Sequence, residues 1–383
     1  MHRLIVLPGE FQRLGGTVIS LSLLLDGIQR LGMESQLTVL LQENSVTHQY
    51  LQNKDLTECV ELVSGDSRLA CMRMAFEWID RQPKHHALLL DNWADRNLMP
   101  LLMVEGLKQR LIQRPTYHFC HDLSISHNYL GYLLRKAAFA CVAPTAICNS
   151  NFTASYIRPL IPTIGGVLYQ PVDTERFQAS LGPVPPGLEA IVASNAKILL
   201  TPSRINKPKI VNDKNLRALI PVLAELKQMD AHYHLVIIGP DTSSDGSHAQ
   251  SLLDLAKRYG VEDCFTILPP AIDIERYFLF AEAVITLAPR EPFGRTVVEA
   301  IASGTPVIGS NTGGIAEILN NFAPEWTVDP EDAPAVAKRI VSLLDTPEAT
   351  QQTLQDGRYW ISNHCQVTQY AKDLMLLTGM VMG

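Results

Sequence analysis

The stretch from Val284 to Leu319 most constrains what this chain can fold into. It begins with a short apolar run, Val284–Leu287, which is typical of a buried parallel strand. A loop with two prolines follows, and from Arg295 apolar residues recur at helical spacing until Gly304 ends the segment. A second apolar strand and a second glycine-opened helix complete the unit. This order predicts parallel strands with helices packed on them.

Such a unit places two helix N-termini at the carboxyl edge of a parallel sheet. Each N-terminus has free N–H groups and about half a positive charge, which suits a phosphate. Glu291 precedes the first helix, and Glu299 lies on that helix about 7.5 Å along its axis from Gly294. Because two anions so close to a phosphate cannot bind it, we expect them to accept hydrogen bonds from vicinal hydroxyls. A phosphate between a hexose diol and a ribose diol is the outline of a nucleotide-sugar.

This stretch also resembles the donor-site signature of the retaining glycosyltransferases of family 4. The resemblance rests on the two glutamates eight residues apart and on the run Glu291-Pro292-Phe293-Gly294-Arg295-Thr296-Val297-Val298-Glu299, with Gly304-Thr305-Pro306 and Gly313-Gly314-Ile315 after it. It implies that the donor contacts Phe293, Gly294, Arg295, Thr296 and Glu299, while Glu291 acts at the sugar. Arg295 departs from the family, which usually has an aliphatic residue there.

The same resemblance implies an α/β fold of the GT-B type, in which two Rossmann-like doubly wound domains face an interdomain cleft. A length of 383 residues suits two domains of ordinary size. The proline-rich stretch 182–187 reads as the linker. We therefore expect an acceptor-side domain over residues 1–180 and a nucleotide-sugar domain over residues 190–360. A C-terminal helix within 365–383 is expected to pack back on the first domain.

Composition excludes several classes of protein. Hydrophobic residues make up 46% and charged residues 19% of the chain, as in globular proteins, and no apolar run approaches the ~20 residues that span a bilayer. The apolar segment at the N-terminus is too short for a secretory signal. No basic stripe interleaves with aromatics, so nucleic acid is not an expected partner. The seven cysteines form no Cys-x-x-Cys pair, which favours free thiols in the cytoplasm.

In the first half of the chain, two strand ends carry candidate residues. Gly15 and Gly16 follow the first strand without a Gly-x-Gly-x-x-Gly pattern, and in the resembled family such a pair lets the backbone approach the donor diphosphate. His121 follows the strand Thr116–Cys120, and in that family the equivalent histidine touches the donor sugar. The polar run Asp91-Asn92-Trp93 ends another strand and is a candidate for the acceptor side.

A basic loop follows the first strand of the second half. Arg204 can place two hydrogen bonds on a diphosphate, while a lysine acts as a point charge. Lys214 is favoured by its position just before the next helix, and Lys209 by its spacing from Arg204. The sequence leaves this choice open.

The function implied is that of a retaining hexosyltransferase. It would move glucose, as a best guess, from a UDP-sugar to a glycan or lipid-linked acceptor, with attack on the face from which the diphosphate leaves. Polysaccharide biosynthesis in the cytoplasm, at the inner face of a membrane, is the usual setting. No Asp-x-Asp follows a strand, so neither a metal nor another cofactor is expected. Two alternatives stay open, a sugar-nucleotide epimerase and a non-catalytic nucleotide-sugar-binding regulator on the same fold.

Overall fold

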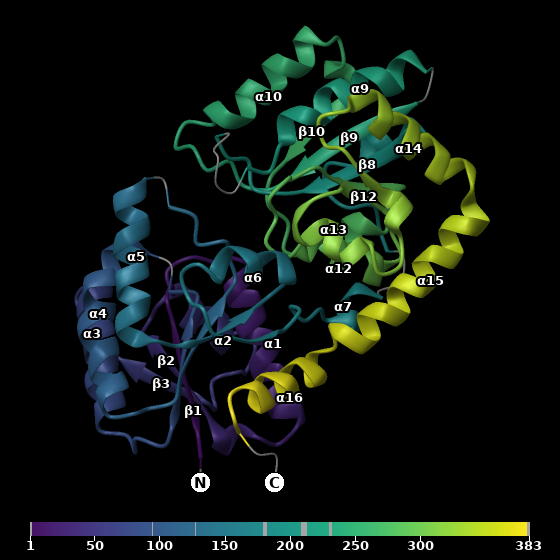
Figure 1. Ribbon diagram of the computed structural model, residues 1–383. Coiled ribbons are helices and arrows are strands. Elements are labelled where there is room, and N and C mark those ends of the chain that lie inside the picture. Colours follow the sequence, from purple (N-terminus) through teal and green to yellow (C-terminus); the bar gives the residue numbers. More distant parts are fainter. Residues whose placement is uncertain are drawn as a thin grey trace. The chain divides into compact units, whose positions relative to one another are not determined.

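The computed structural model of the protein describes residues 2–93, 95–126, 128–178, 182–207, 213–229 and 232–380. The chain divides into two units. In Figure 1 the first runs from purple to teal and includes the yellow C-terminal end, and the second runs from teal through green to yellow. The first contains Met1–Pro171 and His364–Gly383, and the second contains Val172–Asn363. The linker-like stretch 182–187 and the expected boundary near residue 180 therefore both belong to the second unit.

The first unit holds a seven-stranded, all-parallel sheet in the order β3-β2-β1-β4-β5-β6-β7. Every residue of β1 and β4 is buried, as expected for central parallel strands with both faces covered. The strands are β1 (Leu4–Pro8), β2 (Leu37–Gln42), β3 (Val60–Val63), β4 (Ala87–Asp91), β5 (Thr116–Cys120), β6 (Thr145–Cys148) and β7 (Ile164–Val167).

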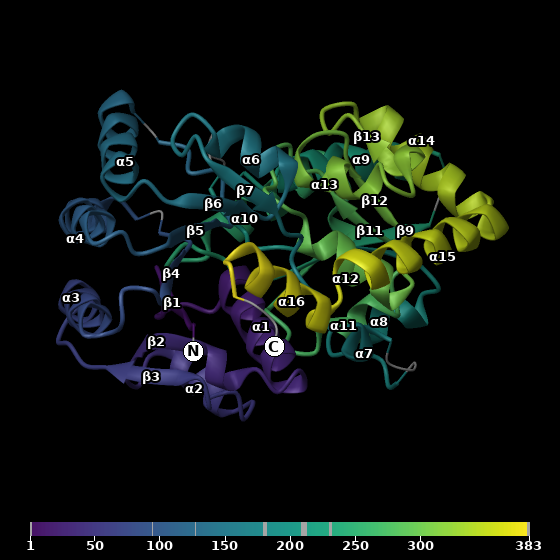
Figure 2. The ribbon, with the colours of Figure 1, turned by 60° about the horizontal axis from the view of Figure 1, so that its bottom comes forward.

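Helices cover both faces of this sheet. In both ribbon views α3, α4 and α5 lie side by side on one face (Figures 1 and 2). On the other face α1 packs on α16, which returns from the end of the chain. Gly27 makes this contact close, because a Cβ there would lie 2.6 Å from the Val367 carbonyl oxygen. The helices are α1 (Gly16–Arg30), α2 (Val46–Gln52), α3 (Arg68–Asp80), α4 (Met99–Leu111), α5 (Tyr129–Val142), α6 (Asn151–Ile157) and α16 (Val367–Leu377), with short 3-10 turns at Glu34–Gln36 and Arg96–Leu98.

The second unit holds a six-stranded, all-parallel sheet in the order β10-β9-β8-β11-β12-β13. Its strands are β8 (Lys197–Pro202), β9 (Tyr233–Ile238), β10 (Phe265–Leu268), β11 (Ala283–Thr286), β12 (Val307–Ser310) and β13 (Thr327–Val328). Its helices are α7 (Thr174–Phe177), α8 (Glu189–Ala193), α9 (Leu219–Gln228), α10 (Ser247–Arg258), α11 (Ile274–Phe278), α12 (Arg295–Ser303), α13 (Gly313–Leu319), α14 (Ala333–Asp345) and α15 (Pro347–His364), with 3-10 turns at Leu216–Ala218, Glu262–Cys264 and Pro324–Trp326. Both units are thus Rossmann-like, and the predicted GT-B class of fold is confirmed.

Each sheet has one point where the strand order reverses. The reversal lies between β1 and β4 in the first unit and between β8 and β11 in the second. Open α/β sheets bind ligands beyond the carboxyl ends of the strands at such a reversal. Arg204 follows β8 and Glu291 follows β11, while Gly15 follows β1 and Asp91 ends β4. The topology therefore gathers these candidate residues at two reversal points.

Two further features concern the chain as a whole. Within the described ranges, no helix is both long and apolar enough to cross a bilayer. All seven cysteines lie in those ranges, and none forms a disulfide. Burial raises the pKa of the Cys59 and Cys71 thiols to about 11, so both stay protonated at neutral pH.

Candidate functional site

Helix α12 begins at a glycine turn. Gly294 precedes the helix with φ 98°, in the left-handed region that glycine enters at little cost, and Gly304 ends it with φ 85°. The N–H groups of a first helical turn point out of the N-terminal end, and here the Val297 N–H donates to the Gly294 carbonyl at 2.9 Å. Arg295 and Thr296 lie in this turn and are partly exposed. Phe293 is only 2% exposed as a whole residue, so its side chain packs in the interior and offers no surface to a ligand.

The second glycine turn holds the loop that carries Glu291. A Cβ on Gly314 would lie 2.5 Å from the Phe293 carbonyl oxygen, and one on Gly313 would lie 3.0 Å from that of Glu291. The Gly314 N–H donates to this Glu291 oxygen at 2.7 Å, and the Thr312 hydroxyl donates to the Pro289 carbonyl, also at 2.7 Å. These glycines therefore let two backbone segments meet, which fixes the loop.

Glu291 and Lys214 form an ion pair in this loop. Lys214 Nζ lies 2.5 Å from Glu291 Oε2, and both side chains are about a quarter exposed or less, at 24% and 21%. The two residues are 77 positions apart and come from the loops after β8 and β11. A lysine and a glutamate that the sequence marked as candidates thus meet at the reversal point of the sheet.

Asn215, which the sequence did not single out, holds Lys214 in place. Its backbone has φ 50°, and its side chain is almost completely buried. Its Nδ2 group donates to the Leu287 carbonyl at 3.3 Å and to Glu331 Oε1 at 3.0 Å, so the carboxamide ties the loop to the end of β11. Asparagine tolerates left-handed backbone better than most residues. A polar residue directly before a helix was the only signal for it.

Arg204 lies where the sequence placed it, at the turn after β8, and its side chain is exposed. The end of β9 approaches this turn closely, since a Cβ on Gly239 would lie 2.0 Å from the Ser203 carbonyl oxygen. Lys209, the alternative to Lys214, lies outside the described residues. Only Lys214 can therefore be placed beside Glu291.

Glu299 lies on α12 and keeps part of its surface accessible. Burial raises the pKa of its carboxyl to about 7, against lowering effects of Arg295 and Arg176. Because this pKa lies near neutral pH, a small change in the surroundings of the Glu299 carboxyl decides whether it is protonated or ionised. A pair of hydroxyl donors would favour the ionised form.

In the first unit, the Gly15-Gly16 turn opens α1. Gly15 has extended backbone at φ −169°, is exposed, and would have no heavy atom within 4 Å of an added Cβ. Nothing in the fold therefore requires glycine at this position. A hollow of only about 10 Å³ lies between the ends of β1 and β4, with Gly9, Glu10 and Asp91 in its lining.

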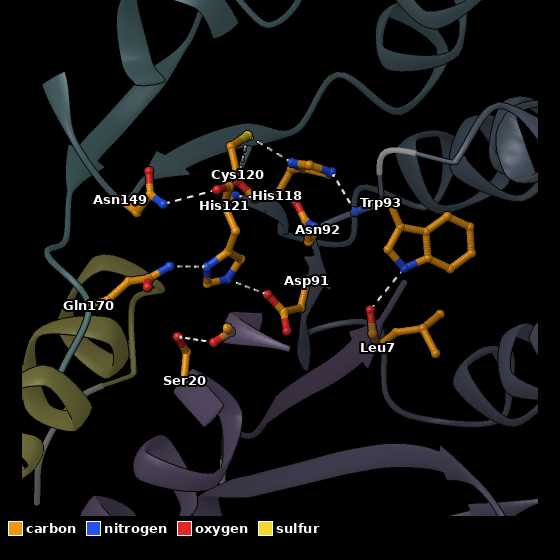
Figure 3. Close-up of polar contacts among 11 residues, drawn as sticks. Leu7, Ser20, Asp91, Asn92, Trp93, His118, Cys120, His121, Asn149 and Gln170 are labelled. Carbon is orange, nitrogen blue, oxygen red and sulfur yellow. Dashed lines mark hydrogen bonds and ion pairs between the residues drawn. The ribbon is translucent and has the colours of Figure 1, made fainter. Parts of the chain in front are cut away.

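His121 is held at both ring nitrogens (Figure 3). Its Nε2 lies 2.7 Å from Asp91 Oδ1, and its Nδ1 lies 2.8 Å from Gln170 Nε2. Since a carboxylate only accepts hydrogen bonds, Nε2 carries the proton and Nδ1 accepts from the amide. The His121 side chain is 4% exposed. A sugar could hydrogen-bond to a ring nitrogen only by displacing Asp91 or Gln170.

The structure changes the interpretation of the polar run Asp91-Asn92-Trp93, which the sequence suggested for the acceptor side. Asp91 and Asn92 both hydrogen-bond to His121. Asp91 accepts from the His121 ring, and the Asn92 carboxamide oxygen accepts from the His121 backbone N–H at 3.3 Å. Trp93, proposed for the acceptor side, is instead a core residue. It is 0% exposed and donates its indole N–H to the Leu7 carbonyl at 2.9 Å (Figure 3). Among the described residues, no group of three or more His, Cys, Asp or Glu has the geometry of a metal site.

Comparison with known proteins finds a family model that matches most of the second unit. Residues 193–360 match the family model of the glycosyl transferases group 1. A D-inositol 3-phosphate glycosyltransferase of Thermobispora bispora is 29% identical over 157 residues, which are 40% of this chain and 36% of that protein. This chain thus aligns with less than half of the length of such curated relatives.

Solved structures resemble both units. The crystal structure of Anabaena Alr3699/HepE in complex with UDP has a TM-score of 0.78 and 17% identity over 99% of this chain and 100% of that one. The same protein in complex with UDP-glucose gives a TM-score of 0.75 and 18% identity, with the same coverage. At these identities the likeness establishes the fold.

Proposed function

We propose that the protein transfers a hexose from a nucleoside diphosphate sugar, because residues 193–360 match the family model of the glycosyl transferases group 1. The donor would bind to the second unit, and the first unit would supply the acceptor surface. We propose UDP-glucose as the donor and a glycan or a lipid-linked saccharide as the acceptor. The choice of UDP-glucose is supported by the Anabaena protein of the same fold, whose structures contain UDP and UDP-glucose.

The ion pair of Lys214 with Glu291 carries this proposal. It combines a cation and a hydroxyl acceptor at the reversal point of the sheet, beside the glycine-opened start of α12. A diphosphate would take the lysine and the helix N-terminus, and Arg204 would add a forked donor. The hexose hydroxyls would then take Glu291, and the ribose hydroxyls would take Glu299.

The proposed chemistry retains the anomeric configuration. The bond from the anomeric carbon to the diphosphate breaks, and negative charge develops on the leaving oxygens. Lys214, Arg204 and the N–H groups at the start of α12 would stabilise that charge. The acceptor hydroxyl would attack on the same face and give its proton to a leaving phosphate oxygen. Because Glu291 is assigned to the sugar hydroxyls, a double displacement through a carboxylate nucleophile is not proposed.

A thermal-shift screen tests the donor. UDP and UDP-glucose should raise the melting temperature of the protein more than GDP, ADP and their sugars do, because a ligand that binds only the folded state stabilises it. If no nucleotide raises it, the donor site is rejected. Incubation of the stabilising nucleotide-sugar without an acceptor separates the alternatives, since an epimerase would change the sugar and a transferase would leave it unchanged or hydrolyse it slowly.

A further inference from the structure

A hollow of about 370 Å³ lies at the amino edge of the first sheet, the edge opposite to that of Asp91 and His121. We call it the amino-edge pocket. Its walls come from the segment before β1, the loops before β4 and β5, and the end of α16, which lie at the same end of the first unit (Figures 1 and 2). Its volume is that of a site for a small molecule. Its lining includes His2, Lys84, His85, Ile112, Tyr117 and Met380.

The charged groups of this pocket have one sign. Lys84 and two histidines line it, and no aspartate or glutamate is among the described residues of the lining. Lys84 has no ion pair with a carboxylate anywhere in the described part of the chain. Asp80, the acid at the end of the preceding helix α3, pairs with Lys108 instead. The formal net charge of the chain is −7, yet this pocket favours an anion.

A buried guanidinium holds the turn that carries Lys84 and His85. The His86 N–H donates to the Pro83 carbonyl at 3.0 Å and closes this turn. Arg114 is 4% exposed, and its Nη1 donates to the same Pro83 carbonyl and to that of His86, both at 3.0 Å. Its Nη2 donates to two more carbonyls of the segment, also at 3.0 Å. Because a buried guanidinium must keep its hydrogen bonds, the backbone under the two basic side chains is fixed before a ligand arrives.

The pocket offers several hydrogen-bond donors besides Lys84. The rings of His2 and His85 pack edge to face with their centroids 5.1 Å apart, so the two imidazoles lie together. Burial raises the pKa of the Tyr117 hydroxyl, which therefore stays protonated and can donate. Within the described ranges this hydroxyl has no hydrogen-bond partner. A phosphate monoester has three acceptor oxygens and nearly two negative charges, so it suits this set of donors better than a carboxylate with two oxygens.

The remaining wall of the pocket is apolar and well fixed. Ile112 contributes to it from the loop before β5, and Met380 contributes from the end of α16. The Met380 N–H donates to the Met375 carbonyl at 2.8 Å and the Gly379 N–H to the Leu376 carbonyl at 3.0 Å, which is the hydrogen-bond pattern of a Schellman motif. Met380 is only 4% exposed and packs in the core of the first unit. An apolar wall of this kind suits the carbon skeleton of an organic anion better than a bare inorganic ion.

We propose that the amino-edge pocket binds an organic phosphate monoester. The phosphate takes the ammonium, the two imidazoles and the phenol, and the carbon skeleton lies on the apolar wall. This site is separate from the proposed donor site, which belongs to the second unit, and it does not depend on the transferase function. It is also separate from His121. Ala87 lines the pocket at one end of β4, and Asp91, which binds His121, ends that strand about 13 Å further on.

Calorimetric titration of the full-length protein with phenyl phosphate tests this site, with UDP present in excess to occupy the proposed donor site. We expect phenyl phosphate to bind more tightly than benzoate, which has a carboxylate head, and phenol not to bind. The variant Lys84→Met/His85→Gln should lose about tenfold or more in affinity, because it removes charge-assisted hydrogen bonds. Both side chains are exposed and the contacts of Arg114 are with the backbone, so the melting temperature should stay constant.

Two further variants separate this pocket from general electrostatics. Tyr117→Phe removes one hydroxyl without a change in charge, and it should weaken phenyl phosphate several-fold. Lys257→Met/His232→Gln makes the same exchange at two exposed residues of the second unit, and it should bind like wild type. The proposal is overturned if wild type does not bind phenyl phosphate, or if the variant at positions 84 and 85 binds it as wild type does. It is also overturned if the second-unit control loses as much affinity, or if phenol or benzoate binds at least as tightly as phenyl phosphate.

Discussion

Lys214 Nζ lies 2.5 Å from Glu291 Oε2, across two loops that leave neighbouring strands of the second sheet. In the proposed complex these groups have separate partners, a diphosphate for the lysine and a hexose for the glutamate. A donor must therefore exchange the ion pair for new contacts. Since both side chains remain partly exposed, the cost of separating them is modest.

Removal of the Glu291 carboxylate should act on turnover. We expect Glu291→Ala to lower kcat by ~10²–10³, the scale of a lost transition-state hydrogen bond. Affinity for bare UDP should stay constant or rise, because Lys214 loses its competing partner. Steady-state kinetics and UDP calorimetry on the same preparation measure both. Activity within threefold of wild type would reject the assignment of Glu291 to the sugar.

Removal of the Lys214 charge should act on the nucleotide. Lys214→Met is expected to weaken UDP binding by about 1.5–3 kcal/mol, the worth of a charge-assisted hydrogen bond. Lys207→Met is a matched control, because Lys207 is an exposed lysine in the same basic loop. If the control loses as much affinity as Lys214→Met, the effect is general electrostatics and Lys214 is not a specific ligand.

Glu299 makes a prediction that depends on pH. Glu299→Ala should weaken UDP by about 1.5–3 kcal/mol through the ribose hydroxyls. Since hydroxyl donors favour the ionised carboxylate, the preference of wild type for UDP over 2′-deoxy-UDP should grow as the pH rises through about 7. Taking the ratio of the two affinities cancels the titration of the phosphate itself. A ratio of one at every pH would remove Glu299 from the ribose.

The same carboxyl should affect stability in the absence of ligand. Its pKa in the folded protein, about 7, lies above the ordinary 4.5, so folding favours the protonated form. The stability it contributes is complete below about pH 4.5 and is lost as the pH rises through 7. Glu299→Gln, which cannot ionise, should therefore raise the melting temperature at pH 8 and change it little at pH 4.5. The opposite order would contradict the raised pKa.

Much of the second unit was predictable from the sequence. The apolar runs and the glycines around α12 and α13 are local signals, and local signals determine the strands, the turns and the position of Glu291 after β11. The sequence did not predict what the glycine pair Gly313-Gly314 contacts. Gly313 and Gly314 pack on the backbone of residues 291–293, and such a contact depends on how two loops meet.

Partners that are distant in sequence account for what the sequence could not predict. Gln170 lies 49 residues from His121, and Asn215 lies 116 residues from Glu331. Neither residue belongs to a periodic pattern or a motif that would mark it. The burial of Trp93 was missed for a similar reason, because a tryptophan after a strand faces the ligand edge or the core according to the packing around it.

Substitution of Gly15 should test donor binding without changing the stability of the fold. Its backbone is extended and an added Cβ meets no atom within 4 Å, so Gly15→Ala should leave the melting temperature nearly unchanged. If the backbone approaches the donor diphosphate here, the methyl group should weaken UDP-glucose binding several-fold. Gly246→Ala is the opposite control, because φ 73° makes alanine strained there although the space is open. Unchanged donor affinity in Gly15→Ala would remove Gly15 from the site.

His121 should affect stability and donor binding in ways that can be separated. His121→Ala leaves the buried Asp91 carboxylate without its ring partner, and we expect a loss of about 2–4 kcal/mol in the free energy of unfolding, measured by urea denaturation. Gln170→Ala should cost less, because it removes a neutral hydrogen bond. If His121 also contacts the hexose, His121→Ala lowers affinity for UDP-glucose and leaves affinity for UDP unchanged. Equal losses for the two ligands, or none, would leave His121 as a residue that only holds Asp91 and Gln170 in place.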